Sequence, residues 1–90
     1  MARKEKVTKV IDGDTFETGS RKNPVRLANV NAPEKGQVGA AQAKAALQNL
    51  IQGKEVSIET VARDKYRRSV AQVKADEKSV NRAMQRELKK

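Results

Sequence analysis

Short runs of hydrophobic residues, separated by polar turns, divide this chain into predicted strands and helices. Strands are indicated where β-branched or alternating apolar residues lie between clusters of Gly, Pro, Asp and Asn. This pattern predicts strands at residues 7–11, 15–18, 25–30, 56–59 and 69–73. The fourth strand has room to run on to residue 61. Residues 1–6 are charged and without pattern, so we expect a frayed, solvated entry there.

Two segments have apolar residues at intervals of three and four, the spacing of one helix face. Residues 40–52 are rich in Ala and Leu, which are strong helix formers, and Gly53 is expected to end this helix. After a turn at residues 75–78, Ser79 is a candidate N-cap for a last helix from residue 80 to about residue 88.

This order of elements predicts a β-rich α+β fold. Five short strands around a mid-chain helix favour a five-stranded OB-type Greek-key barrel with one mid-chain and one C-terminal helix. A split α+β sandwich fits the same periodicity and is the structural alternative. In the third strand, alternation places Arg26 on one face with Ala28 and Val30. A charge among small and apolar residues is costly unless a carboxylate or an anion pairs with it.

Composition narrows the chemistry. The 90 residues suggest one domain, and 20 basic against 11 acidic residues give a formal charge of +9. This excess favours a polyanion such as nucleic acid as partner, although a solvated basic surface is the simpler alternative. Without Cys or His, disulfides, a histidine base and a His or Cys zinc site are excluded. Any general base must be a carboxylate, and any metal a hard cation bound by oxygen.

The sequence sets few limits on the protein's compartment. No apolar run is long enough to cross a bilayer, and no signal-peptide core follows Met1, so we expect no membrane partner. The protein is secreted or periplasmic if a leader has been removed, and cytoplasmic otherwise. The oligomeric state stays open.

Three loops carry the candidate chemistry: residues 12–14, residues 31–34 and the basic cluster at residues 64–68. We expect these loops to meet in space. Asp12 and Asp14 flank a glycine after the first strand, which alone is also a good hairpin turn. Asn31 offers an amide oxygen and Ala32 a backbone carbonyl at the end of the third strand. With water completing the shell, these oxygens suit Ca²⁺.

The same loops offer groups for phosphodiester hydrolysis. Glu34, which follows a rigid proline, can orient or deprotonate a metal-bound water, or is simply an exposed loop acid. Arg26 and Arg68 can grip phosphate oxygens and stabilise the charge that builds up there, although Arg68 can equally be a solvated cation like its neighbour Lys65. Tyr66 is either a packing residue at the rim or a contact for phosphate or base.

Four motifs in order resemble the staphylococcal nuclease (thermonuclease) family. They are residues 10–16 (VIDGDTF), residues 25–34 with Val-Arg-Leu at the start and Ala-Pro-Glu at the end, residues 64–68 (DKYRR) and the Val-Asn pair at 80–81. The match runs from about residue 7 to about residue 84, nearly the whole chain, so residues 1–90 are identified as a single domain of this type.

The resemblance implies an OB-type barrel and Ca²⁺-dependent cleavage of single-stranded or frayed DNA and RNA, with little sequence preference and 3′-phosphate products. It implies that Asp14 binds calcium and that Arg26 and Arg68 bind the scissile phosphate. Glu34 assists the attack of water. Lys65 and Tyr66 contact a terminal phosphate of the bound nucleotide.

The sequence departs from the family pattern in three places. Asn31 stands where the family has a metal-binding Asp, so the site loses a negative charge and we expect weaker calcium binding. Arg67 replaces a glycine. Family members usually continue with a further helix, so we expect a minimal or truncated member with low stability as a monomer. The alternative function is a catalytically weak or inactive OB-fold module that binds nucleic acid, but the retained Asp14, Arg26, Glu34 and Arg68 favour the enzyme.

Overall fold

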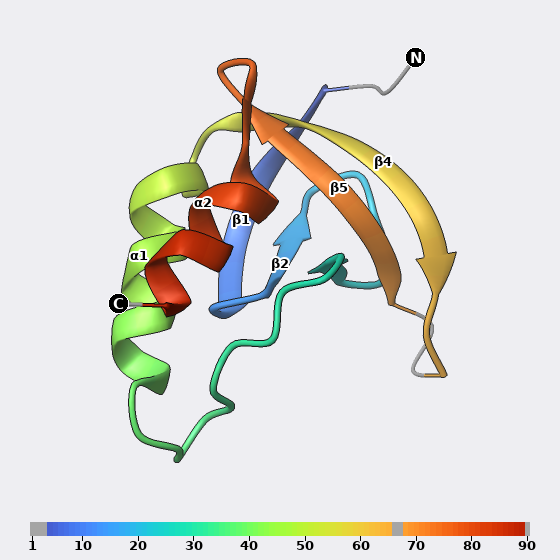
Figure 1. Ribbon diagram of the computed structural model, residues 1–90. Helices are drawn as coiled ribbons and strands as arrows, with labels where there is room; N and C mark the ends of the chain where they lie inside the picture. The colour runs from blue at the N-terminus through green and yellow to red at the C-terminus, as the bar shows by residue number, and fades with distance from the viewer. Residues whose placement is uncertain (1–3, 66–67, 90) are drawn as a thin grey trace.

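The strands of the protein form a closed barrel (Figure 1). A computed structural model describes residues 4–65 and 68–89. In chain order the strands of the ring are β1 (Lys4–Asp12), β2 (Thr15–Thr18), β3 (Val25–Leu27), β4 (Glu55–Arg63) and β5 (Ser69–Ala75). β1, β2 and β3 form an antiparallel meander, and β4 pairs antiparallel with both β1 and β5. A parallel pairing of β3 with β5 closes the ring, which confirms the predicted five-stranded barrel.

Two helices cover one side of the barrel (Figure 1). α1 (Ala40–Ile51) packs against β1 and against α2 (Val80–Leu88), and α2 also contacts β5. The end of α1 and the start of α2 lie where the sequence predicts them. Gly53 has φ 74° just beyond α1, and the Ser79 side chain accepts a hydrogen bond of 3.2 Å from the backbone N–H of Arg82. Within the described residues, no helix is long and apolar enough to cross a membrane.

The barrel interior and the inner faces of the helices form a single apolar core. Alternation along the strands supplies most of it, and the three-and-four spacing of each helix supplies the rest. Its largest fully buried side chains are Phe16, Leu27, Leu47, Ile51, Met84, Val7, Val10, Val25, Val30, Val56 and Val73. Burial of these side chains, worth about 1.5–3 kcal/mol each, is the main force that holds the site loops in place.

The structure corrects the sequence prediction in four places. Lys4–Lys6 are not a frayed entry, because they pair as part of β1 with residues 55–57 of β4. β3 ends at Leu27 rather than at residue 30. Leu27 and Ala28 are both buried, so the alternation breaks directly after β3, and Asn29, with φ 60°, is exposed between buried Ala28 and Val30. The expected turn at residues 75–78 is shorter, because a two-residue strand, β6 (Lys78–Ser79), pairs with the end of β5.

Candidate active site

The turn between β1 and β2 is held by close packing at its glycine. A Cβ atom on Gly13 would lie 2.6 Å from the Cβ of Ala43 in α1 and 2.9 Å from the Cβ of Ala32. Only glycine allows three segments to approach this closely. The packing fixes the turn that carries Asp12 and Asp14 against both the helix and the loop after β3.

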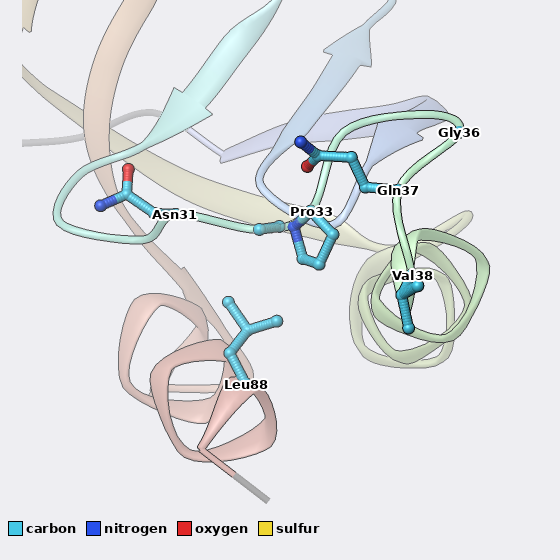
Figure 2. Close-up of a pocket in the computed structure, with 7 residues that line it drawn as sticks. Asn31, Pro33, Gly36, Gln37, Val38 and Leu88 are labelled. Atoms are coloured by element: carbon cyan, nitrogen blue, oxygen red, sulfur yellow. The ribbon is translucent and has the colours of Figure 1, made fainter.

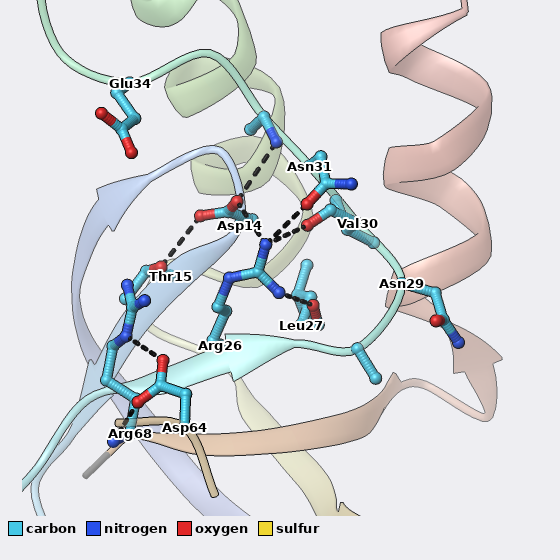
Figure 3. A network of polar contacts seen from close by, with 12 residues as sticks. Asp14, Thr15, Arg26, Leu27, Asn29, Val30, Asn31, Glu34, Asp64 and Arg68 are labelled. Carbon is cyan, nitrogen blue, oxygen red and sulfur yellow. Dashed lines mark hydrogen bonds and ion pairs between the residues drawn. The ribbon is translucent and has the colours of Figure 1, made fainter. Parts of the chain in front are cut away.

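Asp14 is held in one orientation at the start of β2 (Figure 3). The residue is only 9% exposed. Its Oδ1 accepts a hydrogen bond of 2.9 Å from the hydroxyl of Thr15, and its Oδ2 accepts one of 3.1 Å from the backbone N–H of Ala32. Each carboxylate oxygen has a further lone pair, so Asp14 keeps acceptor capacity towards the pocket.

Arg26 of β3 lies beside the Asp14 carboxylate. This opposite charge offsets the energetic cost expected for a guanidinium among small and apolar residues. Its Nη2 is 3.6 Å from Oδ2 of Asp14 and donates hydrogen bonds to Oδ1 of Asn31 at 2.8 Å and to the carbonyl of Val30 at 3.0 Å. A third, longer bond of 3.4 Å joins Nη1 to the carbonyl of Leu27. The guanidinium is therefore fixed by its own loop before any ligand binds.

Arg68 approaches the same pocket from the segment before β5. Its Nε donates to Oδ2 of Asp64 at 2.7 Å, and its backbone N–H donates to Oδ1 of the same carboxylate at 3.0 Å. The pairing of β3 with β5 sets Val25 opposite Ser69, so Arg26 and Arg68 come from adjacent points of neighbouring strands. Figure 3 shows both guanidinium groups on the same side of this strand pair.

Glu34 lies across the pocket on the loop after Pro33. The loop is folded by a 2.8 Å hydrogen bond from the backbone N–H of Glu34 to Oε1 of Gln37. Among the described residues the Glu34 carboxylate has no hydrogen-bond or ion-pair partner, and Figure 3 shows it without a contact. Sequence reasoning missed Gln37. Its signal in the sequence was a polar side chain three residues after Glu34, a spacing at which a side chain can bond to the backbone of a turn.

These side chains enclose one polar pocket of about 380 Å³. Its lining consists of Asp12, Asp14, Arg26, Asn31, Ala32, Glu34, Gln37 and Arg68. The three loops singled out in the sequence therefore do meet. Carboxylate and guanidinium groups share a small volume, an arrangement suited to binding a cation and a phosphate side by side.

The donor set fits a hard divalent cation in kind, because carboxylate and amide oxygens are the ligands such ions prefer. The part of the chain that the structure describes contains no group of three acidic side chains placed to hold one metal ion. Asp14 offers a carboxylate to this pocket, and Asn31 offers an amide oxygen. A cation held by these two side chains would take the larger part of its coordination shell from water.

The remaining predicted residues lie as follows. Ala32 faces Asp14 with its backbone N–H, whereas the sequence suggested its carbonyl as a metal ligand. Lys65 is exposed in the turn between β4 and β5 and does not line the pocket. Tyr66 and Arg67 lie outside the described residues.

Figure 2 shows a second hollow, which lies between the loop at residues 31–38 and the end of α2. It has a volume of about 710 Å³ and is lined in part by Pro33, Val38 and Leu88. The Val38 side chain projects into solvent at 99% exposure. This hollow contains neither arginine of the polar pocket, so it offers no phosphate contact of that kind.

A separate polar cluster joins β1 to β5 through Arg21. Glu5 accepts hydrogen bonds from Arg21 Nε at 2.8 Å, from Ser20 at 2.7 Å and from Thr18 at 3.1 Å. Arg21 also donates to the hydroxyl of Ser69 at 3.2 Å. The hydrogen bond from Arg21, helped by those from the two hydroxyls, holds the pKa of Glu5 below its ordinary value of 4.5, against the opposing effect of burial.

Several known proteins are similar in sequence to this chain. The family model described as staphylococcal nuclease homologue matches residues 24–87. A Haemophilus influenzae protein named "Uncharacterized endonuclease" is 34% identical over 82 residues, covering 88% of this chain and 46% of that protein. An Escherichia coli O157:H7 protein of the same name is 38% identical over 84 residues, with 90% and 55% coverage. An E. coli "Protein ParB" is 35% identical over 69 residues, with 74% and 39% coverage. The chain thus spans about half the length of the curated relatives it matches.

Proposed function

This chain belongs to the staphylococcal nuclease family, and from that premise we propose that it is a Ca²⁺-dependent nuclease. Its substrates are single-stranded or frayed DNA and RNA, cleaved with little sequence preference. Its basic charge of +9 suits a polyanionic substrate recognised through phosphates rather than bases.

One observation carries this proposal: two guanidinium groups line the same pocket as a carboxylate that has no partner among the described residues. Arg26 and Arg68 can each donate N–H hydrogen bonds to a phosphate, and Glu34 faces them without a partner among the described residues. A phosphate between the arginines would present its phosphorus to a water held by Glu34. That is the arrangement which phosphodiester hydrolysis requires.

Each residue has a distinct role in the proposed reaction. Glu34 orients an attacking water and accepts its proton. Arg26 and Arg68 neutralise the charge that grows on the phosphate oxygens, and their existing hydrogen bonds keep them preorganised. When bound, Ca²⁺ supplies Lewis-acid polarisation of the phosphate and a lower pKa for water, with Asp14, Asn31 and the Ala32 carbonyl as its proposed protein ligands. In-line attack with departure of the 5′ oxygen leaves 3′-phosphates.

Cleavage of a single-stranded oligonucleotide, with Ca²⁺ and with a chelator, tests the proposal. We expect Ca²⁺-stimulated cleavage that Glu34→Gln and Arg68→Ala each lower by about a hundredfold or more, a typical effect of losing one acid–base or charge-stabilising group. Glu59→Gln and Arg82→Ala are the matched controls, because both side chains are exposed and outside the pocket. Equal cleavage by all variants, or none by the wild type, would rule out the enzyme.

A nucleic-acid-binding module without turnover is the second candidate. Asn31 favours it, because this amide replaces a charged ligand and accepts a hydrogen bond from Arg26. The module predicts binding whose log affinity falls linearly with log salt concentration, with no product at any Ca²⁺ concentration. The Glu34 carboxylate, which has no partner within residues 4–65 and 68–89, has no use in such a module, and it is the reason for preferring the enzyme.

A further inference from the structure

A third hollow, which adjoins the polar pocket, lies between β1 and the start of α1. It has a volume of about 620 Å³, and Lys9, Lys35 and Lys44 line it. We call it the lysine groove. Its floor is largely apolar and includes Ile11, Ala40 and Ala41. The three lysines come from three elements: β1, the loop after Glu34, and α1.

The charges of the lysine groove are not neutralised within the described chain. Among the described residues, no carboxylate lies within ion-pair distance of Lys9, Lys35 or Lys44. Other cations of the molecule do, since Arg21 pairs with Glu5 and Arg68 with Asp64. The one acidic residue in the lining is Asp12. The groove therefore presents a net positive, partly apolar surface.

This combination suits a nucleic-acid strand better than a small anion. Lysine ammonium groups are flexible point charges that contact phosphates without selecting a base. An apolar floor offers a place for sugars and bases, which a strand without a complement leaves uncovered. A duplex keeps its bases stacked inside, so it would use the lysines but not the floor.

The lysine groove is also continuous with the candidate active site. Asp12 and Gln37 line both the groove and the polar pocket. Lys35 directly follows Glu34 along the loop. A strand whose phosphate lies between the two arginines can therefore continue into the groove without leaving the surface.

We propose that the lysine groove binds the phosphates of the single strand next to the scissile phosphate. This inference rests on the proposed nuclease function for the identity of its ligand. It deepens that function, because it makes the substrate a strand of several nucleotides rather than a single nucleotide. It assigns Lys9, Lys35 and Lys44 to strand binding and not to catalysis.

The test compares two variants that each lose three positive charges. The groove variant is Lys9→Gln/Lys35→Gln/Lys44→Gln. The control variant is Lys22→Gln/Lys74→Gln/Lys78→Gln, whose residues are exposed and line neither the groove nor the polar pocket. Binding of a fluorescent single-stranded 12-mer is measured by anisotropy with a chelator present, at several salt concentrations. Lys9→Gln/Lys35→Gln is included in case loss of half-buried Lys44 disturbs α1.

We expect the groove variant to bind at least tenfold more weakly than the wild type, with the slope of log affinity against log salt reduced by about 2, as for three lost phosphate contacts. The control variant should lose no more than about threefold, and a dinucleotide should bind both variants alike. Equal losses in the two variants, no loss in the groove variant, or no strand binding by the wild type would each overturn the proposal. Because the binding is measured without Ca²⁺, a failure of catalysis leaves this result readable.

Discussion

The Nη2 atom of Arg26 donates a 2.8 Å hydrogen bond to Oδ1 of Asn31 while lying 3.6 Å from Oδ2 of Asp14. The arginine proposed to bind phosphate thus lies between the two side chains proposed to bind metal. A neutral amide accepts this bond more weakly than a carboxylate does. We therefore expect Asn31 to give a weaker cation site, and a weaker hold on Arg26, than an aspartate at this position would give.

Replacing Asn31 with aspartate should strengthen calcium binding. The added negative charge is a main determinant of Ca²⁺ affinity, so we expect Asn31→Asp to raise the affinity about tenfold, or roughly 1.4 kcal/mol. Isothermal titration calorimetry measures this directly, and the cleavage rate at low Ca²⁺ should rise with it. Asn29→Asp is the matched control, because Asn29 is exposed two residues away and does not line the pocket.

Two results would contradict this account of Asn31. An equal gain from Asn29→Asp would mean that net charge alone controls calcium binding. No gain from Asn31→Asp would mean that residue 31 is not a ligand and that its role is confined to Arg26.

Gly13→Ala should damage the site more than the fold. The new methyl group would lie 2.6 Å from the Cβ of Ala43 and 2.9 Å from that of Ala32, so the turn must move. We expect a loss of about 1–3 kcal/mol in the free energy of unfolding, as for other overpacked sites. The same movement should separate Asp14 from the N–H of Ala32 and lower calcium affinity at temperatures where the variant is fully folded.

Gly19→Ala is the natural control for that substitution. A Cβ at Gly19 meets only the Cγ2 of Thr8, at 3.5 Å, which is ordinary contact. Urea unfolding and calcium titration of both variants separate the two effects. If the Gly19 variant is destabilised as much as the Gly13 variant, close packing at the β1–β2 turn is not the cause.

Asn81 should be among the residues most sensitive to substitution outside the apolar core. It is 3% exposed and binds three backbone groups: its Oδ1 accepts from the N–H of Val73 at 2.8 Å, and its Nδ2 donates to the carbonyls of Ala28 at 2.9 Å and Ala71 at 3.0 Å. Asn81→Ala leaves buried groups without partners and should cost about 2–4 kcal/mol. Thermal unfolding tests this, with exposed Arg82→Ala expected to change stability by less than about 0.5 kcal/mol.

The ion pair of Glu5 with Arg21 predicts a pH dependence of stability. The pKa of Glu5 is lowered in the folded protein, so the folded state binds fewer protons than the unfolded state below the ordinary value of 4.5. The resulting stability is present above that pH and is lost as pH falls through the folded pKa. The free energy of unfolding of the wild type should exceed that of Glu5→Gln by about 1 kcal/mol at pH 7.

Urea unfolding between pH 7 and pH 3 measures how that difference changes. It should shrink on acidification, while exposed Glu59→Gln should track the wild type throughout. A difference that stays constant with pH would mean that Glu5 contributes through packing rather than through its charge.

The sequence predicted the ring of strands well but not their ends. Side-chain alternation carries the information about which residues face the core, and it identified the five strands. Lys4–Lys6 belong to β1 through backbone pairing with β4, which leaves no hydrophobic signal. Directly after β3 the expected alternation is lost, because the neighbours Leu27 and Ala28 are both buried, and the left-handed Asn29 follows them.

The candidate site was predictable as a set of loops, because motif residues mark their positions along the chain. Its internal geometry was not. That Arg26 donates to Asn31, and that the Ala32 N–H donates to Asp14, depends on loop conformations which no short motif specifies. Gly13 against Ala43, thirty residues away, is a contact that only the packing of α1 on β1 determines.

The parallel pairing of β3 with β5 has a consequence for folding. β3 is only three residues long, and its partner lies more than forty residues further along the chain, so this junction is expected to form late and to open first. Arg26 belongs to β3, and Arg68 directly precedes β5. A phosphate held by both arginines would fasten this junction of the barrel, and hydrogen exchange along β3 should slow as a nucleotide binds.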